Sequence, residues 1–257
     1  MSAESTRNIF QVLKEVRDDL DEPQDDDTNF WSQDFLLARL NRGLRQVWQT
    51  ARETSENWFI RQLASNEEPI TIFGRPFDPS VMRLTEGITE VVMPPDLFEL
   101  RYLEPVRETD TSDDAGLVFR YADMSRESFR MLSRSTGPTV AGGYTYDVIF
   151  REAGPRLRIA PACGLSEDLD IRIEYVRAVK HFGFRDGFET SGFNDIMIDA
   201  AIAYCELEAY RKEGNQTNIA IAEGRWTEKQ GLVRRSSGPR QTVESETVDG
   251  FLENEID

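Results

Sequence analysis

The stretch of residues 193–212, FNDIMIDAAIAYCELEAYRK, constrains the fold more than any other part of the chain. Its apolar residues recur at helical spacing: Phe193, Ile196, Met197, Ala200, Tyr204 and Leu207. That spacing places them along one face of an α-helix of about five turns. We therefore expect a core helix here, with Cys205 as one of its small buried residues.

Two further helices are expected near the N-terminus. Residues 8–20 form the first, with Ile9, Phe10, Leu13, Val16 and Leu20 on one face. The second follows Ser32, a suitable N-cap, and its apolar residues are Leu37, Leu40, Leu44, Val47, Trp48 and Ala51. Gly43 within it predicts close packing against a neighbour, since glycine costs a helix interior about 1 kcal/mol. Trp58, Phe59 and Leu63 extend this helix or form another short one.

From Pro69 onward the pattern changes to strands. Residues 70–73, 88–93 and 97–103 are short runs rich in β-branched and aromatic residues, separated by glycine and proline. Residues 124–135 interrupt them with a helical pattern. Strict alternation then marks residues 144–150, 157–159 and 169–175, and we expect these three strands to form an antiparallel meander with one solvent-facing side.

These patterns predict an α+β protein in which the N- and C-terminal segments form a helical bundle. A mainly antiparallel β-domain is inserted between them, and the chain ends in an extended tail. The expected boundaries are 1–68 for the N-terminal helices, 69–189 for the β-domain, 190–231 for the C-terminal helices and 232–257 for the tail.

The chain has 257 residues and a net charge of −17, and its ends carry most of this charge. Residues 1–30 have nine acids against three bases, and residues 241–257 have six acids and no base. A chain this acidic is poorly suited to grip DNA, which requires clustered Lys and Arg. No signal-peptide layout or long apolar run is present, so we expect neither secretion nor membrane insertion. The two cysteines, Cys163 and Cys205, are expected to be reduced thiols of a cytosolic product.

No motif predicts catalysis, a cofactor or a metal site. The single histidine, His181, has no partner at a known triad spacing and is interpreted as a packing or loop residue. The acidic run Asp25, Asp26 and Asp27 lacks the alternating ligands and the turn glycine of a calcium loop. The glycine pairs do not form a phosphate-binding loop. The one local basic cluster is Arg234, Arg235 and Arg240, near the C-terminus.

The order of these parts resembles the head-tail adaptor (connector) proteins of tailed bacteriophages. The resemblance covers residues 9–212. It rests on FQVLKEVRDDLDEP, on a Trp-Ser helix start before LLARLNRGLRQV, on VVMPPDLFELRYL and on RIAPACGLSEDLDIRIEYV, followed by the acidic helix. The chain departs from the family pattern at Cys163, where a second proline usually follows Pro161.

The resemblance implies a structural protein of the virion neck, made in the host cytoplasm. It implies a homo-oligomeric ring, commonly of twelve copies, beneath the portal ring. Such a ring extends the DNA channel without sequence-specific binding and seats tail or nozzle proteins. We hypothesise that the tail binds the portal through Arg234, Arg235, Arg240, Phe251 and Leu252. A second hypothesis is that Asp25, Asp26 and Asp27 line the channel and repel DNA.

Two other classes of function remain open at this point. A hydrolytic enzyme with carboxylates from the β-domain would need a pocket that holds a carboxylate pair with split pKa values. A tail-associated host-binding module would usually show longer all-β content and repeats, and no repeat is visible.

Overall fold

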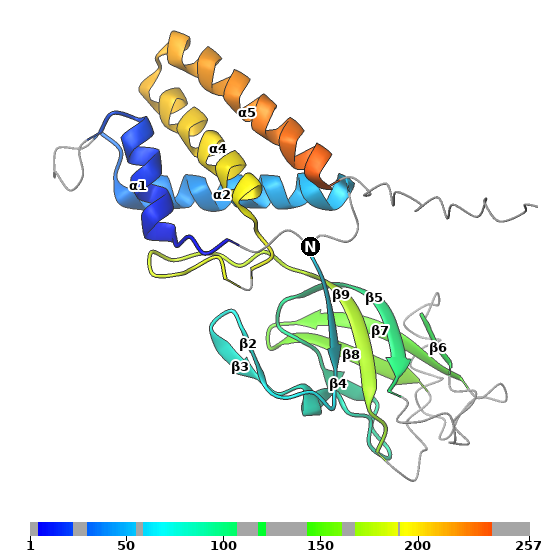
Figure 1. Cartoon of the computed structure of the whole chain (residues 1–257). Coiled ribbons are helices and arrows are strands. Elements are labelled where there is room, and N and C mark those ends of the chain that lie inside the picture. Colours follow the sequence, from blue (N-terminus) through cyan, green and yellow to red (C-terminus); the bar gives the residue numbers. More distant parts are fainter. Residues whose placement is uncertain are drawn as a thin grey trace, which may run out of the picture.

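The computed structural model describes residues 5–22, 30–54, 59–106, 118–121, 143–160, 168–189 and 191–237. Four helices pack together at one end of the molecule and the strands gather at the other (Figure 1). The helices are α1 (Ile9–Asp19), α2 (Gln33–Thr54), α4 (Asp195–Glu213) and α5 (Gln216–Ser237). The protein is therefore a mixed α and β protein, as the sequence predicts.

The two N-terminal helices begin where the sequence places them. Asn8 caps α1 in a capping box, with its side chain accepting from the Gln11 amide at 2.9 Å and its own amide donating to Gln11 Oε1 at 3.0 Å. The Ser32 hydroxyl accepts from the Phe35 amide at 3.3 Å at the start of α2. One expectation is wrong: Phe10 is 54% exposed, and Val12 occupies the buried face of α1 in its place.

Helix α4 is buried around most of its circumference rather than along one face. It packs against α1, α2 and α5, with α5 antiparallel beside it in Figure 1. Residues on successive sides of the helix are all buried, including Ile198, Ala201, Ile202 and Cys205. Ile196, predicted to be in the core, is 39% exposed, although Met197 and Ile198 in the same turn are fully buried.

Gly43 marks the closest approach of α2 to α4, as the sequence predicts. A Cβ atom at this position would lie 2.9 Å from the Ala201 carbonyl oxygen and 3.1 Å from a ring carbon of Tyr204. Any side chain here would collide with backbone, which cannot swing aside. The glycine is therefore required by helix packing.

The strands form two larger sheets and one separate hairpin within the described residues. The first sheet has the order β1 (Ile60–Ala64), β9 (Ile171–Arg177), β5 (Leu97–Pro105). The second has the order β4 (Glu90–Val92), β8 (Gly154–Ala160), β7 (Gly143–Arg151), β6 (Val118–Tyr121). Strands β2 (Ile70–Ile72) and β3 (Arg75–Phe77) pair with each other, and Pro79–Met82 forms a 3₁₀ turn.

Two expectations about strands are wrong, and strand β6 forms where none was expected. Residues 60–64 form β1 instead of a helix, because they pair with β9 from Ile60↔Val176 to Ala64↔Arg172. The three-strand meander is limited to the β7–β8 hairpin, since β9 leaves that sheet to pair with β1 and β5. Strand β3 was not expected at all. The predicted helical stretch at 124–135 lies outside the described residues.

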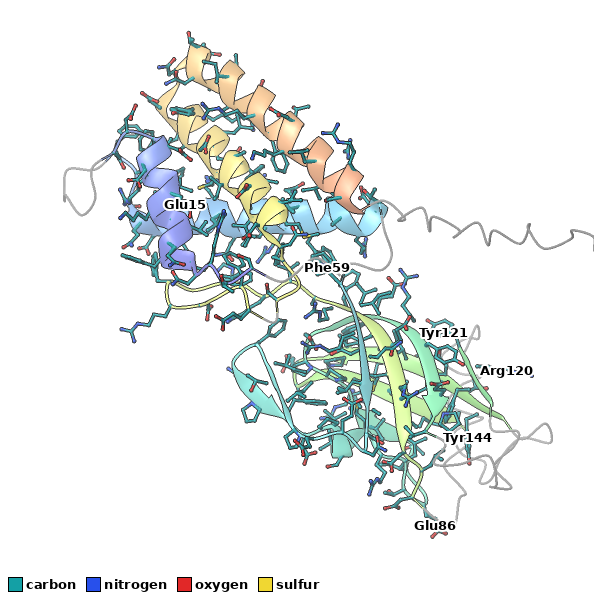
Figure 2. The ribbon with its side chains drawn as sticks, viewed as in Figure 1. Glu15, Phe59, Glu86, Arg120, Tyr121 and Tyr144 are labelled. Atoms are coloured by element: carbon teal, nitrogen blue, oxygen red, sulfur yellow. The ribbon has the colours of Figure 1, made fainter. Side chains whose placement is uncertain are left out.

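Two hydrophobic cores underlie this arrangement. One is shared by the helices and includes Phe59, Val176, Phe182 and Phe193 from the segments that enter and leave the strands. The other is formed by the strands, around residues such as Tyr144, Leu157 and Tyr175. In Figure 2, Phe59 lies between the helices and the strands, whereas Tyr144 lies in the strand region, away from the helices. The two ends of the molecule thus have separate interiors joined at a narrow junction.

Helix α5 continues beyond Gly231 to Ser237. Residues 232–237, expected to begin an extended tail, are helical, and Val233 is fully buried in the helical core. Of the described helices, none is long and apolar enough to cross a membrane.

Candidate functional site

The structure places only part of the predicted set of functional residues. Arg234 and Arg235 lie exposed in the last turn of α5, where positive charge suits the negative end of the helix dipole. Arg240, Phe251, Leu252 and the run Asp25, Asp26 and Asp27 fall outside the described residues. The portal-docking and channel-lining hypotheses therefore remain predictions.

The predictions for single histidine and cysteine residues have clearer outcomes. His181 is exposed in the segment between β9 and α4. Cys205 is fully buried and its thiol donates to the Leu36 carbonyl at 3.4 Å, which confirms its place in the core. Burial raises the pKa of the Cys205 thiol, so it is a poor nucleophile. Cys163 lies outside the described residues.

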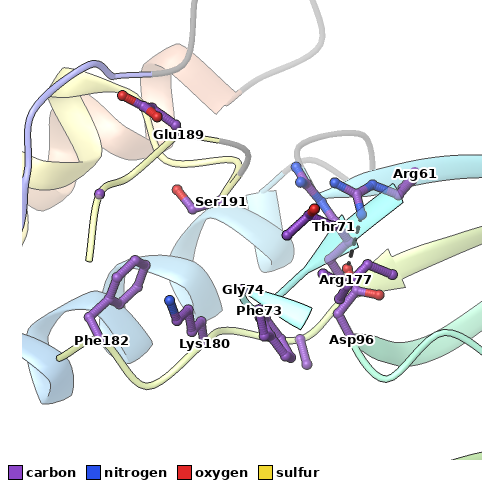
Figure 3. Close-up of a pocket in the computed structure, with 13 residues that line it drawn as sticks. Arg61, Thr71, Phe73, Gly74, Asp96, Arg177, Lys180, Phe182, Glu189 and Ser191 are labelled. Atoms are coloured by element: carbon purple, nitrogen blue, oxygen red, sulfur yellow. Dashed lines mark hydrogen bonds and ion pairs between the residues drawn. The ribbon is translucent and has the colours of Figure 1, made fainter. Parts of the chain in front are cut away.

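A cavity of about 220 Å³ opens at the junction between helices and strands (Figure 3). It lies among the turn of the β2–β3 hairpin, the facing ends of β1 and β9, and the segment leading from β9 toward α4. Arg61, Arg177 and Lys180 bring three positive charges to its wall, and Thr71 and Ser191 bring hydroxyls. Asp96 and Glu189 add two carboxylates, and Ile72, Phe73 and Phe182 add apolar surface. Two anchored groups hold the segments around this cavity.

The first anchored group is Asp96, a carboxylate that is only 3% exposed. It accepts a hydrogen bond from the Tyr175 hydroxyl at 2.9 Å and lies 3.5 Å from an Arg61 guanidinium nitrogen, the contact drawn as a dashed line in Figure 3. Burial raises the pKa of Asp96, against the Tyr175 hydrogen bond and the charges of Arg61 and Arg177, which lower it. A buried ionic cluster therefore fixes the strand side of the junction.

The second anchored group is the amide of Asn41, on α2. Its Nδ2 donates to the Phe182 carbonyl at 2.9 Å and to the Leu37 carbonyl at 3.1 Å, and its Oδ1 accepts from the Phe182 amide at 2.8 Å. One side chain thus satisfies both backbone groups of a buried residue that follows β9. The helix side of the junction is held in register by this contact.

A second cavity, of about 380 Å³, lies among α1, α4 and α5. Glu206, only 4% exposed, faces it from α4, with Asp19 on α1 and Arg225 on α5 also in its wall. Burial and the neighbouring Asp19 carboxylate raise the pKa of Glu206 to about 7, although Arg225, 3.4 Å away, lowers it. Glu206 is therefore a carboxyl group that changes charge near neutral pH.

The two cavities present different carboxylates. Asp19 and Glu206 form a carboxylate pair among the helices, of the kind that an acid-base mechanism would need. Arg225 forms an ion pair with Glu206. The β-rich part supplies Asp96, whose carboxylate accepts a hydrogen bond from Tyr175 and forms an ion pair with Arg61. Across the described ranges, no group of three or more His, Cys, Asp or Glu side chains could hold a metal ion.

The comparison with known families decides the identity. Residues 7–245 match the family described as SU10 adaptor protein, which is nearly the whole chain. The chain belongs to this phage adaptor family. A search of curated proteins found no match. Family membership confirms the resemblance to head-tail adaptors and gives this adaptor a structural role in a phage. It also implies a place in the neck of the virion, in association with portal and tail.

Sequence reasoning missed the residues that build the adaptor's junction. Asp96 lies in the segment VVMPPDLFELRYL, but its partners Tyr175 and Arg61 come from distant strands. Asn41 and Glu206 stand inside helices, where a polar residue is usually solvent-facing. The signal that could have found both Asn41 and Glu206 is a polar residue among the apolar positions of a core helix.

Proposed function

We propose that the protein forms a closed ring beneath the portal of a tailed phage, extends the DNA channel and seats the tail. The ring contains about twelve copies joined by a repeated heterologous contact, which closes by rotation. Its role is structural, with no catalytic step. The family match over residues 7–245 is the observation that carries this proposal.

The fold supports a ring subunit with two bodies. Helices α1, α2, α4 and α5 share one core and the strands share another, and the chain passes from helices to strands and back. We propose that the helices form a bundle domain into which the β-rich segment is inserted. Strand β1 belongs to the inserted part, so its boundary lies before residue 60 rather than at residue 69.

The tail is proposed as the portal-docking element. Arg234 and Arg235 lie exposed at the end of α5, and Arg240 and the Phe251-Leu252 pair follow them in the sequence. Guanidinium groups pair well with carboxylates, and a small apolar pair can anchor in a pocket of the partner. In the same ring, Asp25, Asp26 and Asp27 are proposed to face the channel and keep DNA from adhering.

The test is the mass of the purified protein in solution, alone and after mixing with the portal ring of the same phage. A species of 29.5 kDa that joins the portal as a ring of about twelve copies supports the proposal. A protein that stays monomeric with portal under all conditions would overturn it.

Variants of the tail make the test specific. Deleting residues 238–257 should abolish portal binding and leave the fold intact. The cut should not begin at residue 232, because Val233 belongs to the helical core. Arg75, exposed on β3 and remote in sequence from the tail, provides a control as Arg75→Glu. Portal binding that survives the deletion would remove the tail from the mechanism.

The channel hypothesis has its own test. Asp25→Asn, Asp26→Asn and Asp27→Asn, combined in one variant, should slow DNA packaging or ejection while ring formation is unchanged. Normal packaging and ejection would show that this run does not line the channel.

A further inference from the structure

The outer face of the four-stranded sheet is basic, although the chain as a whole carries −17. In this sheet, paired residues lie on the same side, so the strand register determines which side chains share a face. Val148↔Leu157 and Tyr146↔Ile159 point into the core. The alternate pairs point outward and bring together Arg120, Arg151, Arg156 and Arg158, with Glu90 and Asp147.

The charges on this outer face are unequally satisfied. Glu90 is shared by Arg151 at 3.0 Å and Arg158 at 3.7 Å. Arg120 and Arg156 have no ion-pair partner within the described residues. Arg120 is exposed, and Figure 2 places it at the edge of the sheet, remote from the helices. The face therefore has spare positive charge.

The cross-strand row of Val92, Arg156 and Ile149 on this outer face has an additional property. Arg156 is paired with Val92 of β4 on one side and with Ile149 of β7 on the other. Both neighbours are apolar and partly exposed. A guanidinium between two aliphatic side chains suits a ligand that combines a carboxylate with apolar groups.

We propose that, in protein that is free of portal, this outer face binds the acidic C-terminal segment of the chain, residues 241–257, and that docking on the portal replaces this contact. That segment has six acids and no base, and it places Phe251 and Leu252 between Asp249 and Glu253. Its composition complements the row in charge and in apolar character. The carboxylates pair with Arg120 and Arg156, while Phe251 and Leu252 cover Val92 and Ile149.

The segment is long enough to reach the sheet. Between Ser237, where α5 ends, and Asp249, the extended chain spans up to about 40 Å. In Figure 1, α5 ends on the side of the helices nearer the strands. The connection can therefore cross from the helices to the strands.

The charge balance favours this segment over DNA. Binding to a duplex by counterion release grows with the number of phosphates neutralised, and two unpaired arginines give little of it. The overall charge of −17 also repels a polyanion. A short acidic segment held at high local concentration by its own chain needs far fewer contacts.

The experiment uses the full chain with Cys163→Ser and a nitroxide spin label attached at Val248→Cys. Cys205 stays unlabelled because it is fully buried. At low salt the label should show slow motion, and high salt should release it, since exposed ion pairs are screened. Arg156→Glu should lower the docking equilibrium about tenfold at low salt, because it replaces an attraction by a repulsion. Arg75→Glu, an equal charge change on an exposed arginine of another strand pair, should have no effect.

Two results would overturn the proposal. One is a label as mobile at low salt as at high salt. The other is a mobile label combined with DNA binding: a fluorescent DNA duplex binds the unchanged protein but does not bind the Arg156→Glu variant. That result would show that the face is a nucleic-acid surface. If Arg156→Glu fails to fold, Glu253→Gln with Glu255→Gln tests the same pairing from the tail and should mobilise the label. No portal is present in this assay, so its failure would leave the adaptor proposal standing.

Discussion

Replacing Gly43 by alanine tests the close approach of α2 to α4. In an open helix this change stabilises by about 1 kcal/mol, because alanine restricts the unfolded chain and favours helix. Here the new Cβ would lie 2.9 Å from the Ala201 carbonyl oxygen and within 3.2 Å of two Tyr204 atoms. Overpacking of this kind costs about 1–3 kcal/mol, and the oxygen belongs to backbone that α4 cannot shift alone.

The stabilisation by alanine and the cost of the collision oppose each other, and the collision should have the larger effect. We expect Gly43→Ala to destabilise by about 1–2 kcal/mol, which lowers Tm by several degrees in a protein of this size. The control is Gly224→Ala on α5, where a Cβ meets nothing within 4 Å. It should raise stability by up to about 1 kcal/mol. Thermal and urea unfolding of both variants would measure the difference. A Gly43→Ala protein as stable as Gly224→Ala would refute the helix contact.

Three more predictions concern buried polar groups. Glu206 has a folded pKa of about 7 against an ordinary value of 4.5, so the folded state binds the extra proton between these values. Stability should therefore fall as pH rises from about 4.5 to 7, by up to about 3 kcal/mol. Glu206→Gln should flatten this part of the profile, and an unchanged slope in urea unfolding across pH would contradict the assignment. Asn41→Ala leaves the amide and carbonyl of Phe182 unsatisfied, and should cost about 2–4 kcal/mol in urea unfolding; a loss under about 0.5 kcal/mol would show that water replaces the side chain. Cys205 should resist thiol reagents until the protein unfolds, as peptide mass spectrometry can follow, and fast labelling of the native protein would contradict its burial.

Local patterns in the sequence predicted what depends on local structure. The starts of α1 and α2 follow from capping residues, and Gly43 predicted a close helix contact. Phe10 and Ile196 fitted the same periodicity yet are exposed, although Ile9, Met197 and Ile198 beside them are fully buried. Periodicity indicates an apolar face but not which part of that face the neighbouring elements cover.

The failures concern pairing between distant segments. The alternation of residues 169–175 predicted a strand, which the structure has as β9 at Ile171–Arg177, but it did not predict that β1 and β5 would be its partners. Residues 60–64 were interpreted as part of a helix for the same reason, because their strand partner, β9, is distant in the sequence. The junction was out of reach for this reason: Asp96, Tyr175 and Arg61 meet only after three distant strands have paired.

The pairing of β1 with β9 has a mechanical consequence. The chain enters the strands at Ile60 and leaves them near Val176, and these two residues are direct partners. Both links to the helices therefore leave the sheet side by side and from the same end. A force that pulls the helices away from the strands acts along β1 and β9 together, and it loads the β9–β5 ladder in shear, where many hydrogen bonds must break at once. The narrow junction is in this sense a two-stranded tether, suited to carry tension.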